Sequence, residues 1–160
     1  MFNTKNDLSE ATRAKVVERL NARLADCIDL QTQIKQAHWN VKGPNFIALH
    51  ELFDKVNEAA EDYVDEIAER AVQLGGVAEG TARMVAKRSA LAKYPANAVD
   101  SRSHVEALSN VLAAFGKSVR KAIADANDFG DADTADLFTE ISCGIDKWLW
   151  FVEAHLQGGR

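Results

Sequence analysis

The stretch that decides the fold runs from Asn45 to Gly76 and reads NFIALHELFDKVNEAAEDYVDEIAERAVQLGG. Its apolar residues recur every three or four positions, which is the period of one buried face of an α-helix. Asn45 follows a Gly-Pro break and can cap the start of this helix, and the pair Gly75-Gly76 ends it. We therefore predict a long amphipathic helix over this stretch.

The same period predicts three more long helices, over residues 8–39, from residue 100 or 101 to a turn at 127–131, and from 134 to about 156. Ser9 or Asp7 is the expected cap of the first helix. A short helix is expected near residues 81–88, inside the long connection 77–100. Because this connection is long enough to cross the bundle, we predict an all-α, ferritin-like four-helix bundle with a short extra helix between helices 2 and 3.

Length and composition indicate one domain over residues 1–160, with short tails at 1–7 and 157–160. The polar N-terminus and the lack of a long apolar run predict a cytoplasmic protein without a membrane span. Cys27 and Cys143 are too few for a disulfide framework, and we expect both to be small buried hydrophobes. The net charge of −5 argues against a protein that binds nucleic acid with its whole surface.

Chemistry concentrates between His50 and Glu69, where eight acidic residues are accompanied by one base, Lys55. A solvated helix face is the plain interpretation. However, such faces usually carry lysines one turn from their acids, and these are nearly absent here. His50, Asp54, Asp65 and Glu69 also fall within an arc of about 100° beside the apolar stripe. A cation site is therefore the better interpretation.

One copy of the helix cannot assemble that site. His50 and Asp54 are one turn apart, as are Asp65 and Glu69, but about 22 Å of helical rise separates Asp54 from Glu69. The positions of His50 and Glu69 have the same sum as those of Asp54 and Asp65. Two antiparallel copies related by a twofold axis near residues 59–60 would therefore set one pair against the other, giving two identical sites per dimer.

His38 is the fifth candidate ligand. It ends the first helix shortly before the Gly-Pro break that returns the chain toward His50. A packed core histidine is the alternative, but its position facing the acidic helix favours a ligand. Two imidazoles with three carboxylates suit redox-active iron, whereas zinc and manganese can occupy the same groups. Structural zinc prefers a closed tetrahedral site, usually with cysteine.

Several motifs of this chain closely resemble those of the Dps family, the DNA-protecting mini-ferritins of starved bacteria. They are QAHWN at 36–40, NFIALHELFD at 45–54, DEIAER at 65–70 and LGG at 74–76. The resemblance continues through segments 93–95, 119–123, 133–136 and 146–151, and so covers nearly the whole chain. The Glu-x-x-His motif of larger ferritins does not occur in the sequence.

The resemblance implies a hollow twelve-subunit shell in which each ferroxidase centre holds two iron ions at a dimer interface. His38, His50 and Asp54 would come from one subunit, with Asp65 and Glu69 from its mate. It further implies oxidation of ferrous iron, preferentially by hydrogen peroxide, and storage of a ferric mineral. We expect Glu69 to bridge the two ions.

Other residues carry weaker signals. The resemblance implies that Trp39 quenches stray oxidising equivalents, and simple packing is its alternative role. A second group of acidic residues lies around the turn between the third and fourth long helices: Asp125, Asp128, Asp131, Asp133 and Asp136. These residues are candidates for lining a cation pore at a threefold axis of a shell, and helix capping and solvation are their alternative roles. His104 and His155 lie near expected helix ends, where we expect solvated side chains.

The rival function is that of a nucleoid protein whose main role is DNA compaction. DNA-binding members of the family often carry lysine-rich tails, whereas the tails here offer one lysine, Lys5, and one arginine, Arg160. Because affinity for phosphate comes from many cationic contacts, we expect weak DNA binding at physiological salt, although many copies on one shell would add to it. An interaction module without metal is a third alternative, which the ligand set disfavours.

Overall fold

The computed structural model describes residues 1–158, so Gly159 and Arg160 of the predicted C-terminal tail lie outside it. Within the described residues there are five helices and no strand. They are α1 (Glu10–Asn40), α2 (Phe46–Gln73), α3 (Ala82–Arg88), α4 (Ser101–Phe129) and α5 (Ala132–Glu153). The predicted all-α bundle is confirmed. None of the helices in this part of the chain is long and apolar enough to cross a membrane.

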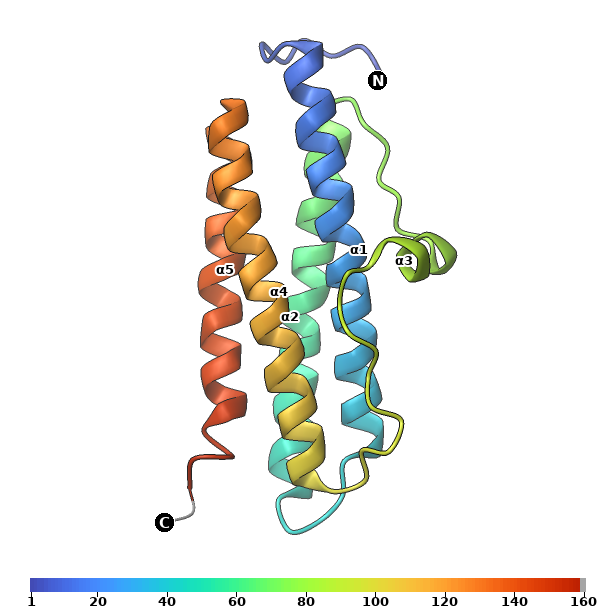
Figure 1. Cartoon of the computed structure of the whole chain (residues 1–160), viewed down its shortest axis with the longest axis vertical. Coiled ribbons are helices and arrows are strands. Elements are labelled where there is room, and N and C mark those ends of the chain that lie inside the picture. The colour runs from blue at the N-terminus through green and yellow to red at the C-terminus, as the bar shows by residue number, and fades with distance from the viewer. Residues whose placement is uncertain (159–160) are drawn as a thin grey trace.

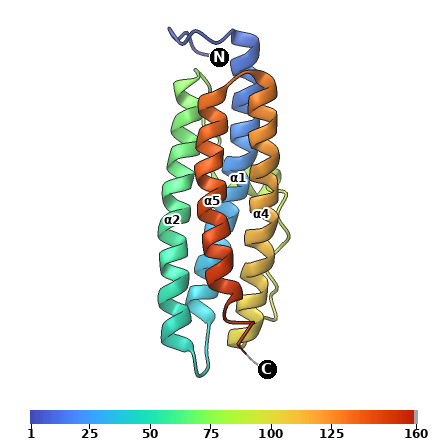
Figure 2. The ribbon, with the colours of Figure 1, turned by 90° about the vertical axis from the view of Figure 1, so that its left-hand side faces the viewer.

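The four long helices lie side by side, and α3 packs on the outside of α1 (Figure 1). α1 pairs with α2, and α4 pairs with α5, each pair joined by a short turn (Figure 2). The connection from α2 to α4 runs the length of the bundle, so that α2 and α4 point the same way. This is the predicted crossover topology, and α3 is the predicted short helix within it.

The core is a continuous apolar cluster to which all four long helices contribute. Phe53, Phe115 and Phe138 are fully buried at its centre. Cys27 is buried as predicted, but the prediction was wrong for Cys143, which is exposed. Residues 141, 142 and 145 take the buried face of α5, and this orientation turns position 143 outward.

The helix ends follow local capping chemistry. The backbone N–H of Thr12 donates to the Ser9 hydroxyl, which identifies Ser9 as the cap of α1. Asp100 and Ser103 form a reciprocal capping box at the start of α4. Asn45 occupies the cap position of α2 but makes no side-chain capping bond. α5 begins two residues before the predicted start, because Asp131 accepts the backbone N–H of Thr134.

Gly144, in the middle of α5, is explained by its neighbour on α2. A Cβ at this position would lie 1.9 Å from the Tyr63 hydroxyl oxygen. We therefore expect Gly144→Ala to destabilise the subunit by about 1–3 kcal/mol through overpacking, despite the better helix propensity of alanine. Urea unfolding measures this change.

Tyr63→Phe in the same chain removes the clashing oxygen and should recover part of the loss. Gly158→Ala is the control, because nothing lies within 4 Å of its added Cβ. An unchanged unfolding midpoint for Gly144→Ala would show that Tyr63 moves aside without cost.

Candidate metal centre

His38 and His50 meet at the turn between α1 and α2. Their rings stack with centroids 3.7 Å apart. The Nδ1–H of His38 donates to the backbone carbonyl of His50 over 2.9 Å, and the Nδ1–H of His50 donates to the carbonyl of His38 over the same distance. The His38 carbonyl belongs to the last turn of α1, where carbonyls have no helical partner. The reciprocal bonds therefore both close the helix end and fix the rings.

These bonds also select the form of each imidazole. Because a carbonyl oxygen only accepts, both Nδ1 atoms carry a proton, and each neutral ring keeps its free lone pair on Nε2. Metal-binding histidines usually donate their other ring N–H to a carbonyl or carboxylate, which fixes the ring and its tautomer. His38 is buried and His50 is half-buried, so the rings are held firmly at the edge of solvent.

Asp54 lies one turn after His50, with its Oδ1 3.8 Å from His38 Nδ1. The ammonium of Lys35 donates to the same oxygen over 2.8 Å. This hydrogen bond is the main reason that the pKa of Asp54 lies below its usual value, and the charge of Lys35 and the two histidines add to it. The Lys35 ammonium thus lies beside the Asp54 carboxylate, where a bound metal cation would otherwise lie.

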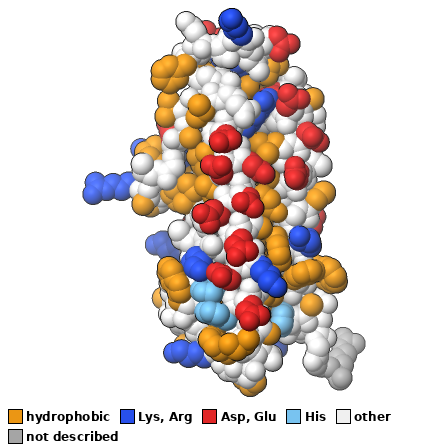
Figure 3. Space-filling model, turned by 180° about the vertical axis from the view of Figure 1, so that it is seen from behind, with side chains coloured by type: hydrophobic (Ala, Val, Ile, Leu, Met, Phe, Trp, Pro, Cys, Tyr) orange, Lys and Arg blue, Asp and Glu red, His pale blue; other side chains and the backbone are white. Residues whose placement is uncertain are grey.

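Asp65 and Glu69 are exposed on the same face of α2, further along the helix. Figure 3 shows acidic side chains along the length of this face, with histidines toward its lower end. Within the described residues, no three His, Cys, Asp or Glu side chains converge on one metal position. The structure brings His38, His50 and Asp54 together and leaves Asp65 and Glu69 apart from them.

An acidic groove of about 300 Å³ lies between α2 and α5, beside Glu69. Its lining includes Glu66, Glu140 and Asp133, together with Arg70. The pKa of Glu66 is raised, first by burial and then by the charges of its acidic neighbours, Glu140 foremost. A concentration of negative charge with one arginine attracts cations to this side of the helix.

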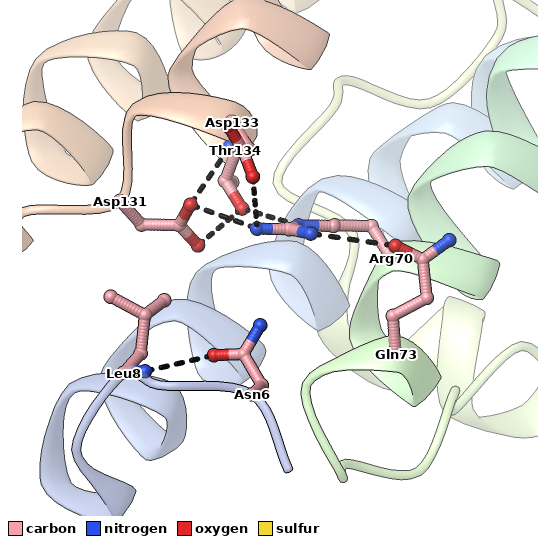
Figure 4. A network of polar contacts seen from close by, with 7 residues as sticks. All are labelled: Asn6, Leu8, Arg70, Gln73, Asp131, Asp133 and Thr134. Carbon is pink, nitrogen blue, oxygen red and sulfur yellow. Dashed lines mark hydrogen bonds and ion pairs between the residues drawn. The ribbon is translucent and has the colours of Figure 1, made fainter. Parts of the chain in front are cut away.

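Arg70, next to Glu69, ties the end of α2 to the turn between α4 and α5 (Figure 4). Its Nη2 lies 2.9 Å from Asp131 Oδ1, and its Nε donates to the Thr134 hydroxyl over 2.9 Å. Asp131 is buried and at the same time caps α5. This network holds the Glu69 end of α2 in a fixed orientation relative to α5.

The pore candidates are not equivalent in the subunit. Asp131 is committed to Arg70 and to its cap, and Asp125 lies 2.8 Å from Arg19 and 2.9 Å from Lys121. The remaining three are exposed: Asp128, Asp133 and Asp136. Capping and close pairing thus account for two of the five acids, and Asp133 makes a longer contact of 3.9 Å with Arg70.

Trp39 is 67% exposed and points away from the core. His155 is exposed as predicted, but the prediction of a solvated His104 was wrong. His104 is 1% exposed, because the connection before α4 folds over the first turn of that helix and Tyr94 covers the ring.

Two residues of the site escaped the sequence analysis. Lys35 lies one turn before His38, and a lysine at that spacing on the ligand-bearing face is a usable signal. Arg70 gives no such signal, because its partners are more than 60 residues away and come close only through the bundle.

Comparisons with known proteins identify the family of the chain. A model of the ferritin-like domain matches residues 17–160. The chain is 46% identical over 154 residues to the DNA protection during starvation protein of Agrobacterium fabrum, covering 96% of this chain and 95% of that protein. It is 34% identical to the protein of the same name from Mycolicibacterium smegmatis, covering 96% and 84%.

Among solved structures, Mycobacterium smegmatis Dps in its tetragonal form superposes with a TM-score of 0.93. The sequence identity is 33%, and the match covers 100% of this chain and 98% of that chain. The bundle, its crossover and the similarity along the whole chain lead to one conclusion: this chain belongs to the Dps family of ferritin-like proteins.

Proposed function

We propose that this protein is a ferroxidase and iron-storage mini-ferritin, whose catalytic unit is a dimer within a hollow dodecamer. One observation carries the proposal: the reciprocal hydrogen bonds of His38 and His50 leave both Nε2 lone pairs free, and the Asp54 carboxylate lies 3.8 Å from the Nδ1 atom of the His38 ring. This half-site has the donors that iron prefers but too few of them to enclose an ion. Asp65 and Glu69 of a second copy complete it.

In the dimer that we propose, the two α2 helices run antiparallel. A twofold axis near residues 59–60 sets each half-site against the acidic end of the partner helix, with two iron ions in each centre and Glu69 between them. Asp54 of one chain must then lie nearer to Asp65 of the other chain than to its own copy. We further propose that Asp128, Asp133 and Asp136 line the cation pores of the shell.

Iron is the substrate of the reaction. Two ferrous ions held together deliver two electrons to one hydrogen peroxide, so that its O–O bond is cleaved to water without release of hydroxyl radical. The protein contributes position: fixed imidazoles, carboxylates that stabilise the ferric product, and an acidic groove that raises the local concentration of cations. In the cytoplasm this reaction would protect DNA, because it consumes ferrous iron and hydrogen peroxide, the two reagents that together form hydroxyl radical.

Stopped-flow oxidation of ferrous iron tests the proposal. Wild type, His38→Ala and Glu69→Ala are mixed with peroxide or with dioxygen, and the ferric absorbance is followed. We expect faster oxidation with peroxide and a large loss of rate in both variants. Wild-type rates in both variants would refute the site.

Removal of Lys35 should strengthen iron binding at low iron concentration. In Lys35→Met the Asp54 carboxylate no longer has a competing ammonium, and exposed ion pairs of this kind contribute about 0.2–1 kcal/mol. The ferrous concentration at half-saturation should therefore fall by up to about fivefold. Anaerobic equilibrium dialysis measures it.

Lys55→Met, an exposed lysine next to Asp54 in the sequence, is the matched control and should bind iron as wild type does. Weaker binding by Lys35→Met would instead mean that Lys35 holds Asp54 in its binding orientation.

Direct DNA compaction is the second candidate function, favoured only by the names of the relatives. A gel shift that persists at moderate salt would support it, because it would require many phosphate contacts.

A further inference from the structure

A buried tyrosine–histidine pair lies outside the proposed iron centre, at the same end of the bundle. The Tyr94 hydroxyl oxygen is 2.5 Å from His104 Nδ1, and the two rings are stacked at 6.0 Å. His104 is 1% exposed, and Tyr94 is half-buried against the hydrophobic core. Neither residue has a role in the proposed ferroxidase centre.

The protonation of the pair follows from its surroundings. Burial raises the pKa of Tyr94 to about 12 and lowers the pKa of His104, so both groups are neutral at pH 7. The phenol O–H therefore donates to the Nδ1 lone pair. The second ring nitrogen, Nε2, then carries the histidine proton and is buried without a hydrogen-bond partner among the described residues. The nearby backbone of Asn40 only partly offsets the effect of burial on the pKa of His104.

Such a pair has a specific redox property. A phenol that loses an electron becomes a strongly acidic cation radical, which gives its proton to a base that is hydrogen-bonded to it. His104 provides a base at hydrogen-bond distance, so electron and proton can leave Tyr94 together. The chain has one other tyrosine, Tyr63, whose hydroxyl lies near the Trp148 indole, a group that is a donor and not a base.

The pair also lies close to the proposed centre. The side chain of Gln33 donates to the carbonyl of Ala92 over 3.0 Å, and His104 lies near the backbone of Asn40. The segment that carries Tyr94 therefore runs beside the last two turns of α1. From Gln33 to Asn40 the helix rises about 10 Å, and His38 lies within that stretch.

We propose that Tyr94 and His104 form a proton-coupled electron donor that neutralises one-electron oxidants produced at the iron centre. This inference rests on the proposed ferroxidase function. The electron donor is needed when a centre holds a single ferrous ion, because one ion supplies one electron whereas the reduction of peroxide requires two.

The single ferrous ion gives one electron to peroxide, the O–O bond breaks, and hydroxide and a hydroxyl radical result. Tyr94 gives the second electron, which reduces the radical to hydroxide, and the phenol proton moves to His104 Nδ1. A tyrosyl radical beside an imidazolium remains. A later ferrous ion returns the electron, and His104 returns the proton.

Freeze-quench electron paramagnetic resonance of the assembled protein tests the pair. The protein is loaded anaerobically with fewer ferrous ions than centres and mixed with hydrogen peroxide. A Trp39→Phe background removes the indole next to His38 in the sequence, and Trp148 and Trp150 are the same in every variant compared. We expect a tyrosyl signal in this background and in Tyr63→Phe, and its loss in Tyr94→Phe. In His104→Gln, where Tyr94 remains but its base is gone, the signal should fall severalfold.

Deuterated solvent provides a readout that needs no substitution: it should slow formation of the signal, because the proton moves with the electron. The ferric absorbance of the same samples distinguishes a failure of the tyrosine–histidine proposal from a failure of the ferroxidase function. Iron oxidation at the usual rate without a tyrosyl signal, or with a signal that survives in Tyr94→Phe, would overturn the tyrosine–histidine proposal alone. A failure of the wild type to oxidise iron would overturn the ferroxidase function itself.

Discussion

An equal mixture of His38→Ala and Glu69→Ala subunits, assembled together, is expected to recover about a quarter of the wild-type centres, although each variant alone is inactive. Each centre takes His38 from one chain and Glu69 from the other. In a mixed dimer, one centre therefore receives both defects, and the other centre receives none.

The expected fraction follows from the symmetry of the dimer. Random pairing makes about half of the dimers mixed, and one of their two centres is intact. The single variants should lose on the order of 100-fold or more in oxidation rate, because loss even of a group behind a metal ligand costs about 10- to 100-fold. Initial rates of peroxide-dependent ferrous oxidation measure the recovery against this low background.

A second mixture is the matched control. His38→Ala and Asp54→Ala affect the same half-site, so a mixed dimer has one defect in each centre and no recovery is expected. Equal recovery in both mixtures would contradict the assignment of residues to the two halves. If neither mixture recovers activity, although mixed assemblies form, the centre is not shared between chains in this way.

Asp131→Ala is expected to destabilise the subunit by about 3–5 kcal/mol. Two losses coincide there: Arg70, with a side chain 13% exposed, loses its carboxylate partner, and α5 loses its cap. Urea unfolding at a fixed protein concentration measures the change, because assembly contributes to apparent stability.

Two further substitutions separate these causes. Asn is itself a good cap, so Asp131→Asn should retain the cap contribution and lose the ion pair. Asp133→Ala removes an exposed carboxylate 3.9 Å from Arg70, and its effect should stay within about 0.5 kcal/mol. An Asp131→Ala variant as stable as Asp133→Ala would mean that the network in Figure 4 adds nothing to stability.

Periodicity was enough to predict the four long helices, because each has one apolar face that must be buried. Helix caps were less predictable: Ser9 caps α1 through the backbone N–H of Thr12, as expected, whereas Asn45 stands at a cap position without capping. The five ligands could be proposed from the sequence alone, because four of them lie on one helix and His38 lies just before the turn that leads to it.

Sequence reasoning failed for residues whose surroundings come from remote segments, either through a wrong prediction or because it offered none. His104 is buried by Tyr94, which belongs to a connection with no periodicity. Gly144 is small because Tyr63 of another helix fills its space. Local pattern carries no information about such contacts, which exist only once the crossover has closed the bundle.

The reciprocal bonds between His38 and His50 have a consequence for how the site tolerates change. Each imidazole is oriented by the main chain of the other residue, and the main chain is present whatever side chain occupies the position. Replacing one histidine thus removes one donor without releasing the other ring. The ligand set can therefore be lost or exchanged one member at a time, with every intermediate keeping an ordered remainder, which makes a gradual change of metal preference accessible to evolution.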